Sequence, residues 1–275
     1  MKTPLAALSA LAAATLALTG CGSSQTSSSS TASSSASSSS AASQASSGKI
    51  QVFAAASLNN AGADLEKAYE AANPGVDITF VYEGSAKLVT QIEQGATPDM
   101  LITADTKNMD KAKKLGEFSG SDSTVLVTNK LVLVTAEGNP GKINSLDDLK
   151  NTNGVVAVCK EDVPCGTLAH QELKKHDITL KNATTEGKVT DVATKVSTGN
   201  ADAGFIYTTD LAAAKKKGAN LGSVELPDVE PNEYPAALSK TGASSAAAKK
   251  FNEWLKTSAE AKKILSDYGF NTTTK

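Results

Sequence analysis

The folded part of the chain opens with the run Ile50-Gln51-Val52-Phe53-Ala54-Ala55-Ala56-Ser57-Leu58. Residues 50–56 form a short apolar segment typical of a buried strand, and Ser57 follows where a helical pattern begins. That pattern keeps apolar residues on one helix face until Asn73-Pro74-Gly75, where Pro and Gly end it. A strand that passes directly into a helix is the building unit of an α/β protein.

The same alternation of strand-like and helix-like runs continues along the chain. Further strands are expected at residues 76–81, 100–103, 125–134, 154–158 and 203–207, and further helices at 85–94, 145–150, 167–175, 188–197, 210–217, 246–255 and 258–268. The run 125–134 is either one strand interrupted at Asn129-Lys130 or a pair of strands. Because the alternation restarts after this run, two α/β lobes with parallel strands account for it better than one continuous sheet.

Residues 1–20 have the features of a bacterial secretory signal. A positive charge at Lys2 precedes the apolar run 5–18, which is too short to span a membrane. Leu18-Thr19-Gly20-Cys21 then places a small residue directly before a cysteine, which resembles a lipoprotein signal. We therefore expect Cys21 to be lipidated and the protein to be extracytoplasmic and anchored to the cell membrane, with an ordinary cleaved signal as the alternative.

The segment that follows, residues 21–48, predicts a flexible tether. From Gly22 to Gly48 it consists mostly of Ser with some Ala, without charged or aromatic residues. Such a segment has nothing to bury and cannot offset the entropy lost on ordering. As a random coil it would reach roughly 30 Å.

Composition narrows the class of function. All 27 basic residues are Lys, and 29 acidic residues give a formal net charge of −2. That balance argues against nucleic-acid binding, which calls for a basic face. The sequence also lacks a Gly-x-Ser-x-Gly elbow, a His-Glu-x-x-His motif and a phosphate-binding loop. His170 could pair with a nearby cysteine, but the pairing rests on proximity in sequence alone, and we expect no enzyme.

Four junctions between a strand and a helix carry small or polar residues: 54–58, 82–86, 163–167 and 186–190. A helix start offers unpaired N–H donors and the positive end of the helix dipole, which together favour an anion. In α/β sheets, ligands bind beyond the carboxyl ends of the strands, where these junctions lie. The alternative is that the serines simply cap their helices.

Cys159 and Cys165 are the two cysteines left after Cys21. In an exported domain, two such cysteines favour a disulfide, here closing a small loop at one of the four junctions. The alternative is a pair of free, buried thiols.

The order of motifs resembles that of the periplasmic molybdate-binding proteins. The matching segments are 49–58, Ser85, Leu88, 91–96, Pro98-Asp99, 102–105, 129–134, 163–166, 204–210, 233–235 and 268–270. The resemblance implies an α/β, two-lobed periplasmic-binding-protein fold of type II. Each lobe would be a mixed sheet flanked by helices, with lobe I formed by residues 49–128 plus 233–275 and lobe II by residues 129–232. The ligand cleft would lie between the lobes.

The same resemblance implies a set of oxyanion-binding residues. Ser57 and Ser85 would donate through hydroxyl and backbone N–H, Cys165 and Val189 through backbone N–H, and Tyr207 through its phenol. Cys165 stands where the family often has Ala, which leaves a main-chain donor intact. The metal would be bound as molybdate, without direct metal ligands, and no cofactor is expected.

The implied function is that of an extracytoplasmic solute-binding protein, a monomer, that captures molybdate and also tungstate. It would deliver the anion to the permease and ATPase of an ABC importer. One alternative is a binding protein for sulfate or another oxyanion. Others are an exported enzyme using Cys165 or His170 in the cleft, and a tethered adhesion or structural domain.

Overall fold

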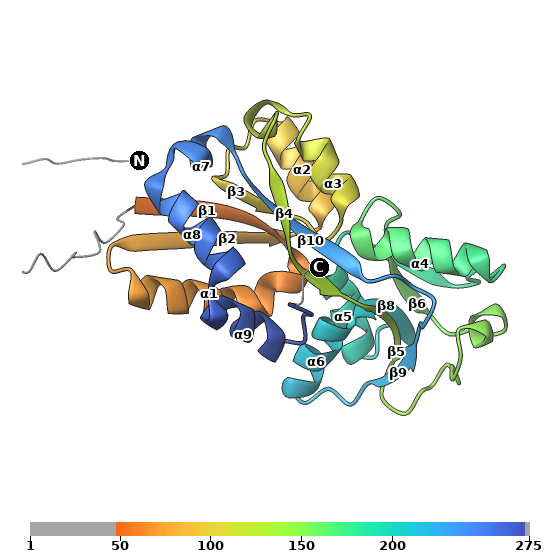
Figure 1. Ribbon diagram of the computed structural model, residues 1–275. Helices are drawn as coiled ribbons and strands as arrows, with labels where there is room; N and C mark the ends of the chain where they lie inside the picture. The colour runs from red at the N-terminus through yellow and green to blue at the C-terminus, as the bar shows by residue number, and fades with distance from the viewer. Residues whose placement is uncertain (1–47, 273–275) are drawn as a thin grey trace, which may run out of the picture. The chain divides into compact units, whose positions relative to one another are not determined.

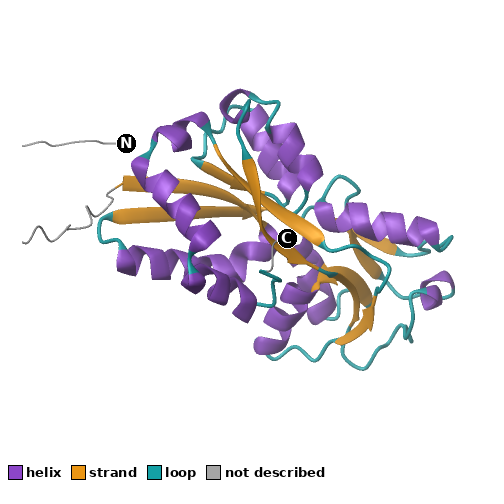
Figure 2. Cartoon of the chain, viewed as in Figure 1, coloured by secondary structure: helices purple, strands orange, loops and turns teal. Residues whose placement is uncertain are grey.

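The computed structural model describes residues 48–272 of the chain. The expected signal, the lipidation of Cys21 and residues 21–47 of the tether lie outside the described residues, whereas Gly48, which was assigned to the tether, is the first residue of a strand. Within residues 48–272, the strands form two five-stranded mixed sheets, and helices flank both of them (Figure 2). This confirms the predicted α/β fold with two lobes.

The first sheet has the strand order β2-β1-β3-β10-β4. Its strands are β1 (Gly48–Ala55), β2 (Val76–Glu83), β3 (Met100–Ile102), β4 (Ser123–Asn129) and β10 (Asn232–Leu238). Strand β1 pairs in parallel with β2 and β3, whereas β10 runs antiparallel to β3 and β4. We call this sheet and the helices packed on it lobe I.

The second sheet repeats this plan with the strand order β7-β6-β8-β5-β9. Its strands are β5 (Leu131–Thr135), β6 (Val156–Cys159), β7 (Ala183–Glu186), β8 (Ala203–Tyr207) and β9 (Gly222–Glu225). Here β6 is parallel to β7 and β8, and β5 is antiparallel to β8 and β9. We call this sheet and its helices lobe II.

Helices cover both faces of each sheet (Figure 1). The α-helices are α1 (Asn59–Ala72), α2 (Ser85–Glu93), α3 (Thr106–Ala112), α4 (Pro164–Lys175), α5 (Val189–Ser197), α6 (Thr208–Lys216), α7 (Lys240–Ser244), α8 (Ala246–Thr257) and α9 (Ala259–Asp267). Short 3-10 turns occur at Ala56–Leu58, Gly116–Phe118 and Asp147–Lys150. Side chains alternate along β1, so Ile50 and Val52 pack with α1, α8 and α9, whereas Phe53 packs with α2 and α3 on the other face.

The chain passes between the two sheets at two places. Strand β4 ends at Asn129 and β5 begins at Leu131, so one residue separates strands of different sheets. Strand β9 ends at Glu225, and the chain returns to lobe I at the start of β10. The ends of both crossovers are adjacent, because Asn232 pairs with Asn129 in the β10–β4 ladder.

Several expected elements differ from the observed ones. The run 125–134 is a pair of strands, β4 and β5, which was one of the two predicted alternatives, but the two strands belong to different sheets. The helix expected at 145–150 is a 3-10 turn, because the Asp148 carboxylate accepts the N–H groups of Asn144 and Ser145 and holds the chain in a tighter bend. Helix α4 begins at Pro164, three residues before the expected Thr167.

Strands β7, β9 and β10 and helices α3 and α7 were not predicted. Strands β7 and β9 are four residues long, and neither contains a buried residue, so they carry no apolar run. In β10, Pro235 follows a register shift after Tyr234, and a proline in a strand is tolerated at such an irregularity. The proline masks the strand pattern.

None of the helices in residues 48–272 has the length and apolar character that a membrane span requires.

Candidate functional site

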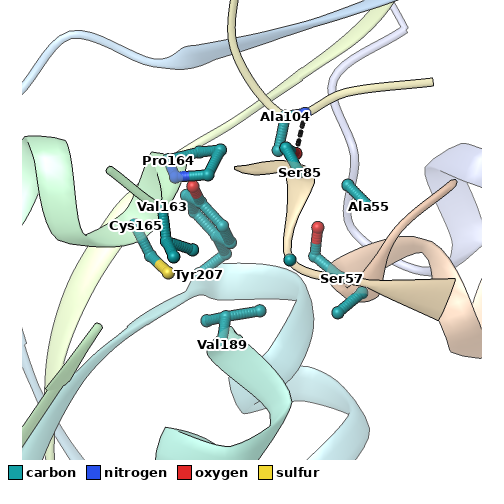
Figure 3. Close-up of a pocket in the computed structure, with 11 residues that line it drawn as sticks. Ala55, Ser57, Ser85, Ala104, Val163, Pro164, Cys165, Val189 and Tyr207 are labelled. Carbon is teal, nitrogen blue, oxygen red and sulfur yellow. Dashed lines mark hydrogen bonds between the residues drawn. The ribbon is translucent and has the colours of Figure 1, made fainter. Parts of the chain in front are cut away.

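A pocket of about 200 Å³ lies where the parallel strands of both lobes end. It is lined by Ala55, Ala56, Ser57, Gly84, Ser85, Ala104, Val163, Pro164, Cys165, Val189 and Tyr207 (Figure 3). These residues follow or end β1, β2, β3, β6, β7 and β8, so the pocket lies at the carboxyl ends of six strands. All five residues that the family resemblance indicated line this one pocket, and all four expected junctions contribute to it.

Three α-helices begin at the pocket wall without a capping side chain. The N-cap residues of α2, α4 and α5 are Gly84, Val163 and Lys188, and none of their side chains bonds to the first helical turn in the described structure. Elsewhere in the chain, α3, α7, α8 and α9 are capped by Asp or Ser side chains. The helix starts that face the pocket therefore keep N–H donors available to a ligand.

The serines of the pocket do not serve as helix caps. Ser85 is the first residue of α2, and its hydroxyl oxygen accepts the N–H of Ala104 at 3.0 Å. The Ser57 hydroxyl lies 2.8 Å from the Tyr234 hydroxyl. Both serines are buried. The capping alternative raised from the sequence therefore does not describe these two side chains.

Tyr207 ends β8, and its phenol is hydrogen-bonded to the Asn232 side-chain amide. Burial raises the pKa of Tyr207 well above its ordinary value. The phenol thus keeps its proton at neutral pH and can donate a hydrogen bond into the pocket.

None of the described residues that line the pocket carries a charged side chain. Two acidic groups lie behind the wall. Burial raises the pKa of Asp105, which caps α3 next to Ala104. Burial also raises the pKa of Asp210 to about 7, although its carboxylate accepts the backbone N–H of Tyr207 at 3.3 Å. An anion in this pocket would therefore be held by backbone and hydroxyl dipoles.

Cys159 and Cys165 form a disulfide with 5.9 Å between their Cα atoms. This is the pairing that their placement in the sequence favoured. It ties the first turn of α4 to the end of β6, and Gly166 lies so close to the Lys160 carbonyl oxygen that a Cβ would approach within 1.9 Å. The Cys165 sulfur is thus bonded to Cys159 and is not a free thiol, while His170 contacts the Cys159 carbonyl oxygen at 3.2 Å and does not line the pocket.

The two lobes touch each other beside the pocket. The Lys188 ammonium of lobe II lies 3.5 Å from the Glu83 carboxylate of lobe I. The Asn108 amide donates to the Asp162 carbonyl oxygen at 3.4 Å. Gly84 packs against Gly187, and a Cβ on Gly84 would lie 2.2 Å from the Gly187 carbonyl oxygen. These contacts describe a closed arrangement of the lobes.

Three polar residues behind the pocket were not predicted as site residues: Asn129, Tyr234 and Asn232, although the first two lie in segments that resemble the family. All three are buried and connect to the pocket hydroxyls. Their signal in the sequence is polarity next to apolar strands, which is too common to indicate a site. Their partners lie between 25 and 177 residues away along the chain.

Comparison with known proteins places this chain in a family. Residues 50–271 match the family model described as bacterial extracellular solute-binding protein. The molybdate-binding protein ModA of Mycobacterium tuberculosis is 39% identical over 221 residues, which are 80% of this chain and 84% of that protein.

Solved structures share the fold. The periplasmic molybdate-binding protein of Azotobacter vinelandii has a TM-score of 0.67 at 21% identity, covering 82% of this chain and 100% of that chain. The sulfate-binding protein SubI of Mycobacterium tuberculosis has a TM-score of 0.70 at 18% identity, covering 81% of this chain and 86% of that chain. At such low identity these two likenesses show the fold alone.

Replacing Gly84 with Ala should prevent the lobes from closing without unfolding either of them. The added Cβ would collide with the Gly187 carbonyl oxygen, which belongs to the other lobe. Small-angle X-ray scattering should give a larger radius of gyration for Gly84→Ala, with an unchanged melting temperature. Gly187→Ala is the matched control, because a Cβ there meets nothing within 4 Å. Equal radii for all three proteins would contradict the prediction.

Because of Asp210, the free energy of unfolding of the protein should fall as the pH rises from about 4 to about 7. Burial raises its pKa to about 7 in the folded protein from an ordinary value of 3.8, so in this window the folded state holds a proton that the unfolded state releases. Asp210→Asn stays neutral and can still accept the Tyr207 N–H. Urea unfolding at several pH values should show that the free energy of unfolding of the variant rises relative to that of the wild type as the pH increases. The change across the window should be on the order of a few kcal/mol. A difference independent of pH would refute this.

Proposed function

The chain belongs to the bacterial extracellular solute-binding proteins and, among them, to the molybdate-binding family, and from this premise we propose that it captures molybdate outside the cytoplasm and passes it to an ABC importer. The observation that carries this proposal is the convergence of three uncapped helix starts and three hydroxyl groups on one pocket. That pocket has no charged side chain among its described lining residues.

The chemistry of the pocket suits a doubly charged oxyanion. Molybdate offers only hydrogen-bond acceptors, and the pocket offers N–H and O–H donors. Each hydrogen bond to a charged group contributes about 1.5–3 kcal/mol. About seven of them would amount to a gross gain of ~10–20 kcal/mol, which desolvation, lobe closure and lost translational freedom oppose.

Each pocket residue has a role in this proposal. Ser57, Ser85 and Tyr207 donate through their hydroxyl groups, and the serines also through backbone N–H. Cys165 and Val189 donate through backbone N–H in the first turns of α4 and α5, where the helix dipoles are also favourable. The metal is held only through its oxygen atoms. Tungstate, which has the same charge and nearly the same size, fits the same cage.

Titration calorimetry with molybdate, tungstate, sulfate and phosphate tests the proposal. We expect molybdate and tungstate to bind tightly, and sulfate and hydrogen phosphate to bind at least tenfold more weakly. Hydrogen phosphate carries a proton that would face a donor, and sulfate is a smaller anion than molybdate. Tight sulfate binding would instead identify a sulfate-binding protein. If none of the four anions gives a heat of binding, oxyanion capture is refuted.

Two variants locate the binding. The double variant Ser57→Ala and Ser85→Ala should lose about 100-fold or more in molybdate affinity, because two hydrogen bonds to a charged ligand disappear. Ser197→Ala removes a serine hydroxyl from an exposed helix position and serves as the matched control. Unchanged affinity in the double variant, with the fold intact by circular dichroism, would place the binding site elsewhere.

We also propose that the mature protein is tethered through a lipid on Cys21 and works as a monomer beside the permease and ATPase. The sequence of residues 18–21 and the Ser-rich segment after it support this. Mass spectrometry of protein purified from membranes should find a lipid-modified Cys21 at the amino terminus. An unmodified Cys21, or cleavage at another position, would contradict the anchor.

A further inference from the structure

A chain of buried hydrogen bonds leads from the crossover between the lobes to a pocket hydroxyl. The Asn129 side-chain amide lies 3.3 Å from the Tyr234 hydroxyl, and the Tyr234 hydroxyl lies 2.8 Å from that of Ser57. The exposed fractions of Asn129, Tyr234 and Ser57 are 3%, 0% and 4%. Water therefore cannot easily replace any link of this chain.

The orientation of the Asn129 side chain is set by its other partners. The backbone N–H of Lys130 donates to the Asn129 Oδ1 at 3.0 Å, and a backbone N–H can only donate. The Thr208 hydroxyl contacts the same oxygen at 3.1 Å. The amide nitrogen must therefore face the other side, where it contacts the hydroxyls of Thr209 at 2.8 Å and Tyr234 at 3.3 Å.

This orientation determines the direction of every hydrogen bond in the chain. The amide NH₂ of Asn129 has no lone pair to offer, so the Tyr234 oxygen must accept from it. The Ser57 oxygen, 2.8 Å away, is the acceptor for the single proton of Tyr234, because this fully buried proton would be left unpaired if Ser57 donated instead. Ser57 therefore accepts from Tyr234, and its own single proton is left to point into the pocket.

We propose that Asn129, acting through Tyr234, is a positioning and specificity-determining residue that keeps Ser57 a hydrogen-bond donor toward the ligand. This inference rests on the proposed function, because it concerns the same pocket and an acceptor-only oxyanion. It goes further by assigning the polarity of the cage to a residue that does not touch the ligand.

The other two pocket hydroxyls have the same arrangement. The Ser85 oxygen accepts the backbone N–H of Ala104 at 3.0 Å, and the Asn232 amide donates to the Tyr207 phenol. Each hydroxyl thus has a fixed donor behind it, and each presents its proton to the pocket. A ligand that brings a proton of its own meets donors on all three sides, whereas a fully deprotonated oxyanion is accepted.

A double-mutant cycle tests the role of Asn129. Asn129→Asp keeps the shape of the side chain but replaces the NH₂ with an acceptor, so Tyr234 would donate to Asp and Ser57 would turn its proton toward Tyr234. Molybdate affinity, measured by calorimetry, should fall about 10- to 100-fold in the otherwise wild-type protein. In a Ser57→Ala background the same change should cost less than about threefold, because no hydroxyl remains to be reoriented.

Equal losses in both backgrounds would overturn the inference, since a new negative charge or a distorted crossover would act whether or not Ser57 is present. Asn252→Asp controls for placing a carboxylate at a buried asparagine outside the pocket, and should leave affinity unchanged. If Asn129→Asp does not fold by circular dichroism, Tyr234→Phe takes its place in the cycle. Removing the Tyr234 hydroxyl takes away the partner that holds the Ser57 hydroxyl in place, so affinity should fall more when Ser57 is present than in the Ser57→Ala background. Equal losses in both backgrounds would again overturn the inference.

The ratio of the affinities for molybdate and hydrogen phosphate gives a second readout. Both are dianions at pH 8, so a general charge repulsion weakens both alike and leaves the ratio unchanged. At pH 8, Asn129→Asp should shift the ratio of molybdate to hydrogen phosphate affinity toward hydrogen phosphate by about tenfold, because the Ser57 lone pair would then face the pocket. An unchanged ratio would contradict the proposed polarity. Failure of the wild type to bind any oxyanion would overturn the proposed function itself, whereas tight binding with additive losses would overturn only the role of Asn129.

Discussion

The amide groups at the starts of α2, α4 and α5 must be satisfied by something other than their own side chains, and this requirement organises the structure. Each helix follows a strand after a short junction, so its first turn lies at the carboxyl end of a sheet. Two lobes with the same strand plan bring helix starts from opposite sides to one pocket. The disulfide and the tight contact at Gly166 hold the start of α4 where its donors are needed.

A cage of neutral donors also explains why no basic side chain is needed. Dipoles that are fixed in the backbone do not reorganise when an anion enters, and the buried site is little screened by salt. The acidic groups behind the wall are compatible with this arrangement. Burial keeps the Asp210 pKa near neutrality, so this carboxyl carries less negative charge beside an anion than an exposed carboxyl would.

The alternation of strands and helices predicted the fold class, and the small residues at the junctions indicated segments that line one pocket. Helix α4 and strand β1 follow from local pattern, because apolar spacing and an early proline act within a few residues. Strand β10 does not, because its central pairing coincides with Pro235 and a bulge that break the strand pattern. The five pocket residues came from family resemblance rather than from local physics. The links from Asn129 and Asn232 to the pocket could not be predicted at all, since hydrogen-bond direction depends on partners distant in sequence.

The two crossovers between the lobes have a practical consequence for anyone who would convert this protein into a sensor. Asn129 and Asn232 are paired with each other in the ladder at the ends of these crossovers, and both also contact hydroxyl groups of the pocket or of its supporting network. A fluorophore or inserted domain at this position would report on the ligand and disturb its recognition together. The exposed turn after α5, at residues 197–200, lies at the opposite end of that helix from the pocket. A label there could report movement of lobe II without contacting the residues that line the pocket.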